Sequence, residues 1–121
     1  MVVGNEGVGK TTLIQTFVGF QQNISDMVEK ASFIEKYIKD VKVGISNSAQ
    51  ETSLRLHIWD TSLQEKYKSS TPMYYRDADA AIFMLDLNDE RSLKDIDNYW
   101  MNAVLDYGPE NIVLAIVAIR S

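Results

Sequence analysis

The chain has 121 residues, of which 45% are hydrophobic, enough for one globular domain with a modest core, and it contains no cysteine. Disulfide bonds, thiolate metal sites and a cysteine nucleophile are therefore excluded. A formal net charge of −5 argues against a broad nucleic-acid surface. Without a bilayer-length apolar run or a secretion signal, the sequence predicts a cytoplasmic protein with one domain, residues 1–121, and no transmembrane segment.

A glycine-rich loop stands between an apolar start and a helical run. Met1–Val3 is typical of the end of a buried strand, Gly4–Thr11 fits the pattern G-x-x-x-x-G-K-[S/T], and apolar residues at helical spacing follow as far as Gly19. In such a loop the backbone N–H groups surround phosphate oxygens, the lysine reaches the terminal phosphates and the hydroxyl binds Mg²⁺. A glycine turn without a ligand is the alternative. The candidate nucleotide-binding residues are Gly4, Asn5, Glu6, Gly7, Val8, Gly9, Lys10, Thr11 and Thr12.

Residues 26–40 carry an apolar stripe at intervals of three and four. Asp26 and Glu29 resemble a capping box, so the spacing predicts a helix over Asp26–Asp40. Its apolar face would either pack on the core or dock a protein partner. The stripe consists of Met27, Ala31, Ile34, Ile38 and Val41.

Three further segments are predicted as strands. Ser53–Trp59 alternates apolar and polar residues and ends at Asp60, as expected of a half-buried strand. Ala80–Leu85 is an apolar strand closed by Asp86. Ile112–Ile119 is almost continuously apolar, which is typical of a central parallel strand covered on both faces.

Between the last two strands, Ser92 opens a predicted amphipathic helix that stops at Gly108. Strands alternating with helices predict a three-layer α/β sandwich with a mostly parallel sheet and right-handed crossovers. The residues expected to face inward from this helix are Leu93, Ile96, Trp100, Val104 and Tyr107.

Two segments carry a resemblance to a known family. Leu56–Thr61 and Lys66–Ala80 are similar to the segments around and after the second switch of Ras-superfamily small GTPases of the Rab branch. The similarity runs from the glycine loop to the last residue but is poor over Gly19–Thr52. It implies the phosphate-loop NTPase topology of small GTPases, truncated at the C-terminal end, with GTP or GDP and Mg²⁺ as ligands.

The resemblance also assigns roles to individual residues. Lys10 would contact the β- and γ-phosphates, Thr11 and Asp60 would hold Mg²⁺, and Gln64 would orient the attacking water as the catalytic residue. A protein effector would bind at the second-switch region, and a lipidated tail after Ser121 would place the protein at the periphery of membranes.

Four departures from the family pattern leave the function open. Leu63 replaces the glycine before Gln64, Glu6 lies where the family has a small residue, Lys42–Gly44 lacks the metal-binding threonine of the first switch, and Ile119–Ser121 lacks the guanine-reading Asn-Lys-x-Asp. One hypothesis is a Rab-like GTPase with slow or impaired hydrolysis that regulates membrane traffic as a switch. A second is a pseudo-GTPase acting as a scaffold. An unrelated phosphate-loop ATPase or kinase is the third, and the Rab-like stretch after Asp60 argues against it.

Overall fold

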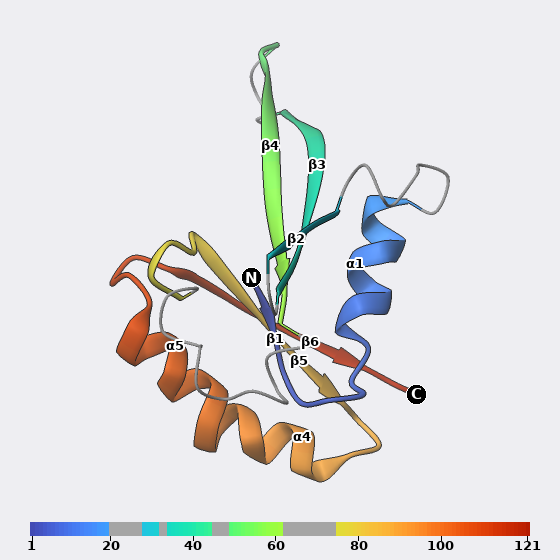
Figure 1. Cartoon of the computed structure of the whole chain (residues 1–121), viewed down its shortest axis with the longest axis vertical. Coiled ribbons are helices and arrows are strands. Elements are labelled where there is room, and N and C mark those ends of the chain that lie inside the picture. Colours follow the sequence, from blue (N-terminus) through green and yellow to red (C-terminus); the bar gives the residue numbers. More distant parts are fainter. Residues whose placement is uncertain (20–27, 32–33, 45–48, 62–74) are drawn as a thin grey trace.

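A six-stranded sheet forms the middle layer of the molecule, with helices on both of its faces (Figure 1). The structure, a computed structural model, describes residues 1–19, 28–31, 34–44, 49–61 and 75–121. In chain order the elements are β1 (Val2–Val3), α1 (Lys10–Val18), β2 (Val28–Ala31), β3 (Ile34–Gly44), β4 (Glu51–Asp60), β5 (Ala80–Asp86), α4 (Glu90–Asp95), the π-helical segment η2 (Ile96–Trp100), α5 (Met101–Tyr107) and β6 (Val113–Ile119).

The described strands lie in the order β2-β3-β4-β1-β5-β6. β1 is parallel to both β4 and β5, and β5 is parallel to β6. β2, β3 and β4 are antiparallel neighbours. The predicted α/β fold with a mostly parallel sheet is confirmed, and both predicted aspartates, Asp60 and Asp86, end a strand.

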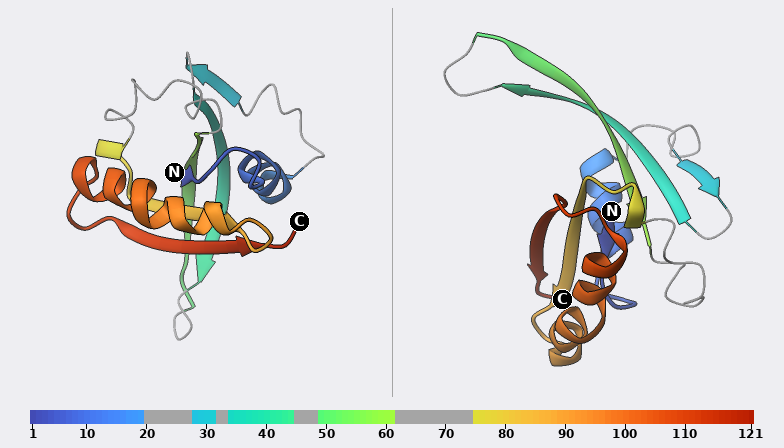
Figure 2. Two further views of the ribbon diagram at one scale, coloured as in Figure 1. Left: turned by 90° about the horizontal axis from the view of Figure 1, so that it is seen from below. Right: turned by 90° about the vertical axis from the view of Figure 1, so that its left-hand side faces the viewer.

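Each face of the sheet has its own core because successive strand residues point to opposite sides. Val2 packs with α1, whereas Val3 packs with the helical layer α4–η2–α5. Figure 2 shows α1 and this helical layer on opposite sides of the sheet. The three layers predicted from the sequence are therefore present. The buried residues of the α1 face are Val2, Val8, Ile14, Val18, Tyr37 and Met84, and those of the other face are Val3, Tyr75, Ala81, Phe83, Leu85, Ile96, Trp100 and Val104.

The predicted helix over Asp26–Asp40 is wrong where the structure describes this segment. Residues 28–31 and 34–44 form β2 and β3, and β3 pairs with β4 along its whole length, from Glu35 opposite Asp60 to Gly44 opposite Glu51. The spacing of apolar residues at intervals of three and four predicted a helix. Pairing with β4 provides hydrogen bonds for the backbone equally well, and from strand β3 the side chain of Tyr37 is buried, with 1% of its surface exposed. The described residues of this segment therefore form no helix on which a partner could dock.

The helix after β5 is confirmed, but its start and its inward face differ from the prediction. It begins at Glu90, where Asp89 caps it by accepting the Arg91 N–H at 3.0 Å, rather than at Ser92. Leu93 and Tyr107 are 54% and 48% exposed instead of facing inward. The buried positions are Ser92, Ile96, Trp100 and Val104, each four residues apart.

The wide turn of η2 accounts for the spacing of Ile96 and Trp100. The Met101 N–H bonds the carbonyl of Ile96, five residues back, so the turn holds more residues than an α-turn and keeps positions four apart on one side. Ser92 is tolerated inside because its hydroxyl bonds the carbonyls of Asp86 and Asp89. No helix in the described part of the chain is both long and apolar enough to cross a bilayer.

Strand β6 exists as predicted, but it is not covered on both faces. It lies at an edge of the described sheet, and the helical layer packs on β1 and β5 without covering it. Ile116 is 59% exposed and Val113 is 64% exposed. A continuous apolar run predicted burial, yet burial depends on which elements pack over the strand.

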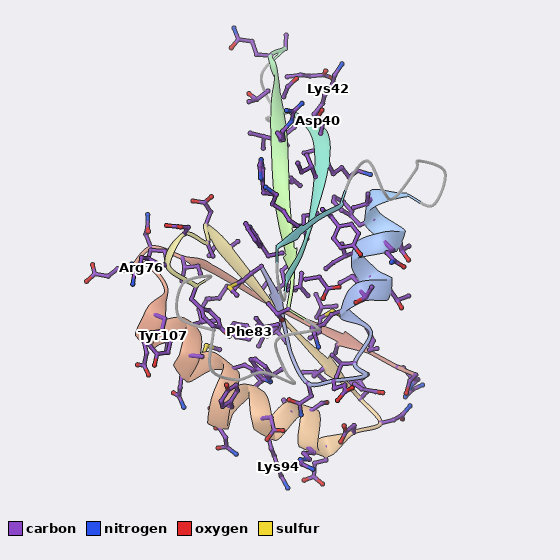
Figure 3. The ribbon with its side chains drawn as sticks, in the orientation of Figure 1. Asp40, Lys42, Arg76, Phe83, Lys94 and Tyr107 are labelled. Carbon is purple, nitrogen blue, oxygen red and sulfur yellow. The ribbon has the colours of Figure 1, made fainter. Side chains whose placement is uncertain are left out.

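Two paired residues test this difference in cover. Phe83 of β5 lies opposite Ile116 of β6 in the register, and Phe83 is 0% exposed; Figure 3 shows its side chain at the centre of the molecule. We expect Phe83→Ala to lower the free energy of unfolding by about 3–5 kcal/mol, because it leaves a cavity in the core. Ile116→Ala, the matched control, should cost less than about 1 kcal/mol. Urea denaturation measures both, and equal losses would contradict this description of the core.

Candidate functional site

The glycine loop joins β1 directly to α1, and its glycines take conformations that other residues avoid. The φ angles of Gly4, Gly7 and Gly9 are 149°, 81° and 95°. A Cβ atom on Gly4 would lie 2.4 Å from the carbonyl oxygen of Met84. Gly9 is the N-cap of α1, so the N–H groups of the first helical turn adjoin the loop. Such a turn with a helix N-terminus behind it is suited to an anion.

Lys10 lies within the loop rather than extending into solvent. Its side chain is almost fully buried, and its ammonium donates to the carbonyls of Gly4 at 2.8 Å and of Asn5 at 2.7 Å. These bonds place the charge in the concave side of the loop. An anion held by the loop would therefore meet a lysine already fixed at that position.

Thr11 and Asp60 are 49 positions apart in the sequence but adjacent in the fold. The hydroxyl of Thr11 donates to Oδ2 of Asp60 at 2.5 Å, and Asp60 is 2% exposed. One hydroxyl and one carboxylate form a donor set that fits Mg²⁺, which completes its shell with phosphate oxygens and water. A cluster of three or more acidic, histidine or cysteine ligands is not found among the residues that the structure describes, so an all-protein metal cage is not the kind of site formed by this part of the chain.

The position of Asp60 depends on the next residue. Thr61 is fully buried, and its hydroxyl donates to the carbonyl of Val2 at 2.7 Å. Val2 is also the residue opposite Asp60 in the parallel pairing of β1 with β4. The end of β4 is thus fixed to the strand that precedes the loop, which keeps Asp60 next to Thr11.

A contact between the loop and the helical layer was not foreseen from the sequence. The side-chain amide of Asn5 donates to Asp95 Oδ2 at 2.6 Å and accepts the indole N–H of Trp100 at 2.8 Å. Trp100 is a core residue, as the sequence predicts, with 7% of its surface exposed. The sequence feature that could have indicated this contact is the indole N–H of Trp100, a donor that needs an acceptor when it is buried.

The other predicted residues are placed less directly. Glu6 and Thr12 are exposed, and Val8 packs in the α1 core. Gln64 and Leu63 lie outside the described residues, as does most of the second-switch region. Ile119, which stands where the resemblance expects the guanine-reading asparagine, brings its Cδ1 to 3.3 Å from the Cβ position of Gly9.

Asp86, the second aspartate at a strand end, takes part in a different set of bonds. It accepts from the Ser121 hydroxyl at 2.6 Å and from the Asn88 N–H at 2.9 Å. These bonds, the first above all, lower the pKa of this half-buried carboxyl. Because the Leu87 N–H also bonds Ile119, Asp86 belongs to the junction of β5 with β6 and not to the Thr11–Asp60 pair.

A large cavity lies away from the loop. It has a volume of about 730 Å³ and is lined by α1, β4 and the start of β5, including Leu13, Phe17, His57 and Trp59. None of the described residues in its lining belongs to Gly4–Lys10. The loop, and not this cavity, is therefore the candidate site.

Comparison with known proteins agrees with the loop and the sheet order. The family model described as "Ras of Complex, Roc, domain of DAPkinase" matches residues 1–120. The chain belongs to this family of Ras-like GTPase domains. It is 36% identical over 117 residues to the rat Ras-related protein Rab-31 and 34% identical over 117 residues to the human Ras-related protein Rab-22A, in each case over 95% of this chain.

A third relative is the GTP-binding protein ypt5 of Schizosaccharomyces pombe, 33% identical over 117 residues and 96% of this chain. The matches cover 54% of Rab-31, 55% of Rab-22A and 51% of ypt5. This Ras-like chain therefore spans about half the length of these relatives. The Rab-like resemblance expected from the residues is confirmed.

The close approach of Gly4 to β5 gives a test of the loop in this Ras-like domain. We expect Gly4→Ala to destabilise the fold by more than about 1 kcal/mol, because the new methyl group would meet a backbone carbonyl and the φ angle disfavours alanine. Gly44→Ala is the matched control, since a Cβ at Gly44 meets nothing within 4 Å. Thermal unfolding of the two variants provides the comparison. A Gly4→Ala protein as stable as Gly44→Ala would show that the loop is not held against Met84.

Proposed function

We propose that the chain binds GTP and GDP together with Mg²⁺ through residues 4–12 and Asp60. The observation that carries this proposal is the buried Lys10 ammonium inside the glycine loop, beside the Thr11–Asp60 pair. The lysine would bind the terminal phosphates, and the hydroxyl and carboxylate would hold the metal. When bound, Mg²⁺ supplies positive charge that offsets the charge of the phosphates. Since the whole chain carries a net charge of −5, local geometry rather than overall charge must select the polyphosphate.

The choice of guanine over another base is supported by family membership and by the name of one relative, the GTP-binding protein ypt5. The described residues give less support to it. Ile119 offers no hydrogen bond to a base edge, and Arg120 stands where the resemblance expects lysine. The preference of this chain for GDP over ADP should accordingly be smaller than the preference of a site that contains Asn-Lys-x-Asp.

Hydrolysis requires more than phosphate binding, because catalysis depends on contacts that strengthen in the transition state. Gln64 is the proposed residue that orients the attacking water. Leu63 replaces the glycine whose N–H the family directs at the γ-phosphate, and a branched side chain cannot take glycine's conformations freely. Glu6 adds a carboxylate to the loop. Both changes weaken the stabilisation of the negative charge on the phosphates in the transition state. We therefore propose a slow GTPase.

A pseudo-GTPase that acts as a scaffold is the second candidate. The position of Ile119 favours it. Its Cδ1 lies 3.3 Å from where a Cβ on Gly9 would be, so an apolar side chain lies next to the loop where the resemblance expects a polar one. The two candidates differ in turnover and not in fold. Both are compatible with the other proposals carried over from the resemblance: an effector at the second-switch region, a role in membrane traffic and a cytoplasmic or peripheral membrane location.

Nucleotide binding is the first test. We expect Lys10→Ala to abolish binding of a fluorescent GDP analogue in the presence of Mg²⁺, because the polyphosphate loses its main cationic partner. Lys94→Ala is the matched control: Lys94 pairs with Glu90 on the outer side of α4 and points away from the loop in Figure 3. Circular dichroism checks that both variants are folded. If the unmutated, folded chain binds no guanine nucleotide, the proposal fails.

The rate of turnover is the second test. Single-turnover hydrolysis of GTP should be slower than roughly 10⁻⁴ s⁻¹, the order of magnitude for unassisted Ras. Leu63→Gly combined with Glu6→Gly should raise this rate, since the loss of one positioned donor commonly costs about 10²–10³ in rate. A wild-type rate at or above that of unassisted Ras, unchanged by the double substitution, would contradict the mechanism. A rate of zero in every variant that binds GTP would favour the scaffold.

A further inference from the structure

Asn5 offers a hydrogen-bonding pattern that both of its partners require. The indole of Trp100 can only donate, and the carboxylate of Asp95 can only accept. A side-chain amide meets both needs at once, with its oxygen toward the indole at 2.8 Å and its nitrogen toward the carboxylate at 2.6 Å. The two partners therefore fix the orientation of the amide, and with it the second residue of the loop.

The wide turn of η2 is what brings both partners to the same place. Asp95 and Trp100 are five residues apart, and on a regular α-helix their side chains would project about 140° from each other. The five-residue backbone bond from Met101 to Ile96 changes that spacing and allows both to reach Asn5. Turns of this kind inside α-helices are often found at functional sites.

The partners are themselves held in position. The ring of Tyr99 meets that of Trp100 edge-on, with 4.7 Å between the centroids, and Trp100 is 7% exposed. Arg91, one turn before Asp95, places its Nε 3.7 Å from the Oδ2 that accepts from Asn5. The carbonyl of Asn5 in turn accepts from the Lys10 ammonium at 2.7 Å. A shift of Asn5 would thus move the group that holds the phosphate-binding lysine.

We propose that Asn5 is a positioning residue that fixes the glycine loop, through Asp95 and Trp100, in the conformation that takes the phosphates. This rests on the proposed function, since it concerns the same nucleotide site. Asn5 acts through the loop backbone and Lys10, and the helical layer α4–η2–α5 becomes part of the machinery that shapes the site.

The decisive experiment exchanges the side chains of Asn5 and Asp95. Asn5→Asp keeps an acceptor for Trp100 but places a second carboxylate against Asp95, so we expect the affinity for a fluorescent GDP analogue with Mg²⁺ to fall at least tenfold. Asp95→Asn added to this variant restores a donor opposite an acceptor and keeps the net charge of the wild type. We expect the double variant to bind within about fivefold of the wild type. Asn102→Asp, on an exposed residue of α5, is the matched control and should stay within about twofold.

Asp95→Ala separates positioning from simple repulsion of the phosphates. It removes a negative charge beside the loop, so repulsion predicts tighter binding, whereas loss of the acceptor for the Asn5 amide predicts weaker binding. The indole N–H resonance of Trp100, observed in a Trp59→Phe background, gives a second reading: it should move in Asn5→Asp and return in the double variant. Unchanged affinity in Asn5→Asp, or a loss without rescue, overturns the positioning role. Absence of nucleotide binding by the wild type is a different result, which refutes the proposed function itself and this role with it.

Discussion

The burial of one positive charge constrains the architecture around the site. An ammonium taken out of water is costly unless its donors are satisfied, and Lys10 is 2% exposed. The loop supplies backbone carbonyls for it, which requires the chain to turn back on itself within a few residues at Gly4 and Gly9. The turn brings Gly4 so close to the carbonyl of Met84 in β5 that a Cβ atom would not fit between them. The positions of the loop and of β5 therefore depend on each other. The charge, the glycines and the neighbouring strand are parts of one arrangement.

The elements predicted correctly are those whose evidence is local. Local sequence patterns are sufficient to predict the glycine loop, the strand that ends at Asp60 and the strand that ends at Asp86. The segment around Tyr37 was misread because its apolar spacing is compatible with a helix as well as a strand, and pairing with β4 decided the outcome. The sequence of the segment alone does not reveal that it pairs with β4.

Burial and long-range contacts were the harder part. The apolar run of β6 indicated a covered strand, but cover depends on where the helical layer lies. The spacing of Leu93 with Ile96 predicted burial, but Ser92 is the buried residue instead, because its hydroxyl bonds the carbonyls of Asp86 and Asp89. The pairing of Thr11 with Asp60 followed from the family resemblance, whereas the contact of Asn5 with Trp100 joins residues 95 positions apart and matched no motif.

The exposed edge formed by β6 has a consequence for the behaviour of the chain in solution. Val113–Ile119 contains seven apolar residues in succession, without charge or proline, and lies at an edge of the described sheet. A strand with this composition and an unpaired backbone is a template on which another copy can add, in the manner of cross-β assembly. The net charge of −5 opposes such association at a distance, but it places no charged gatekeeper within the strand. Among the strands that the structure describes, β6 is therefore the one best suited to pair with a further strand.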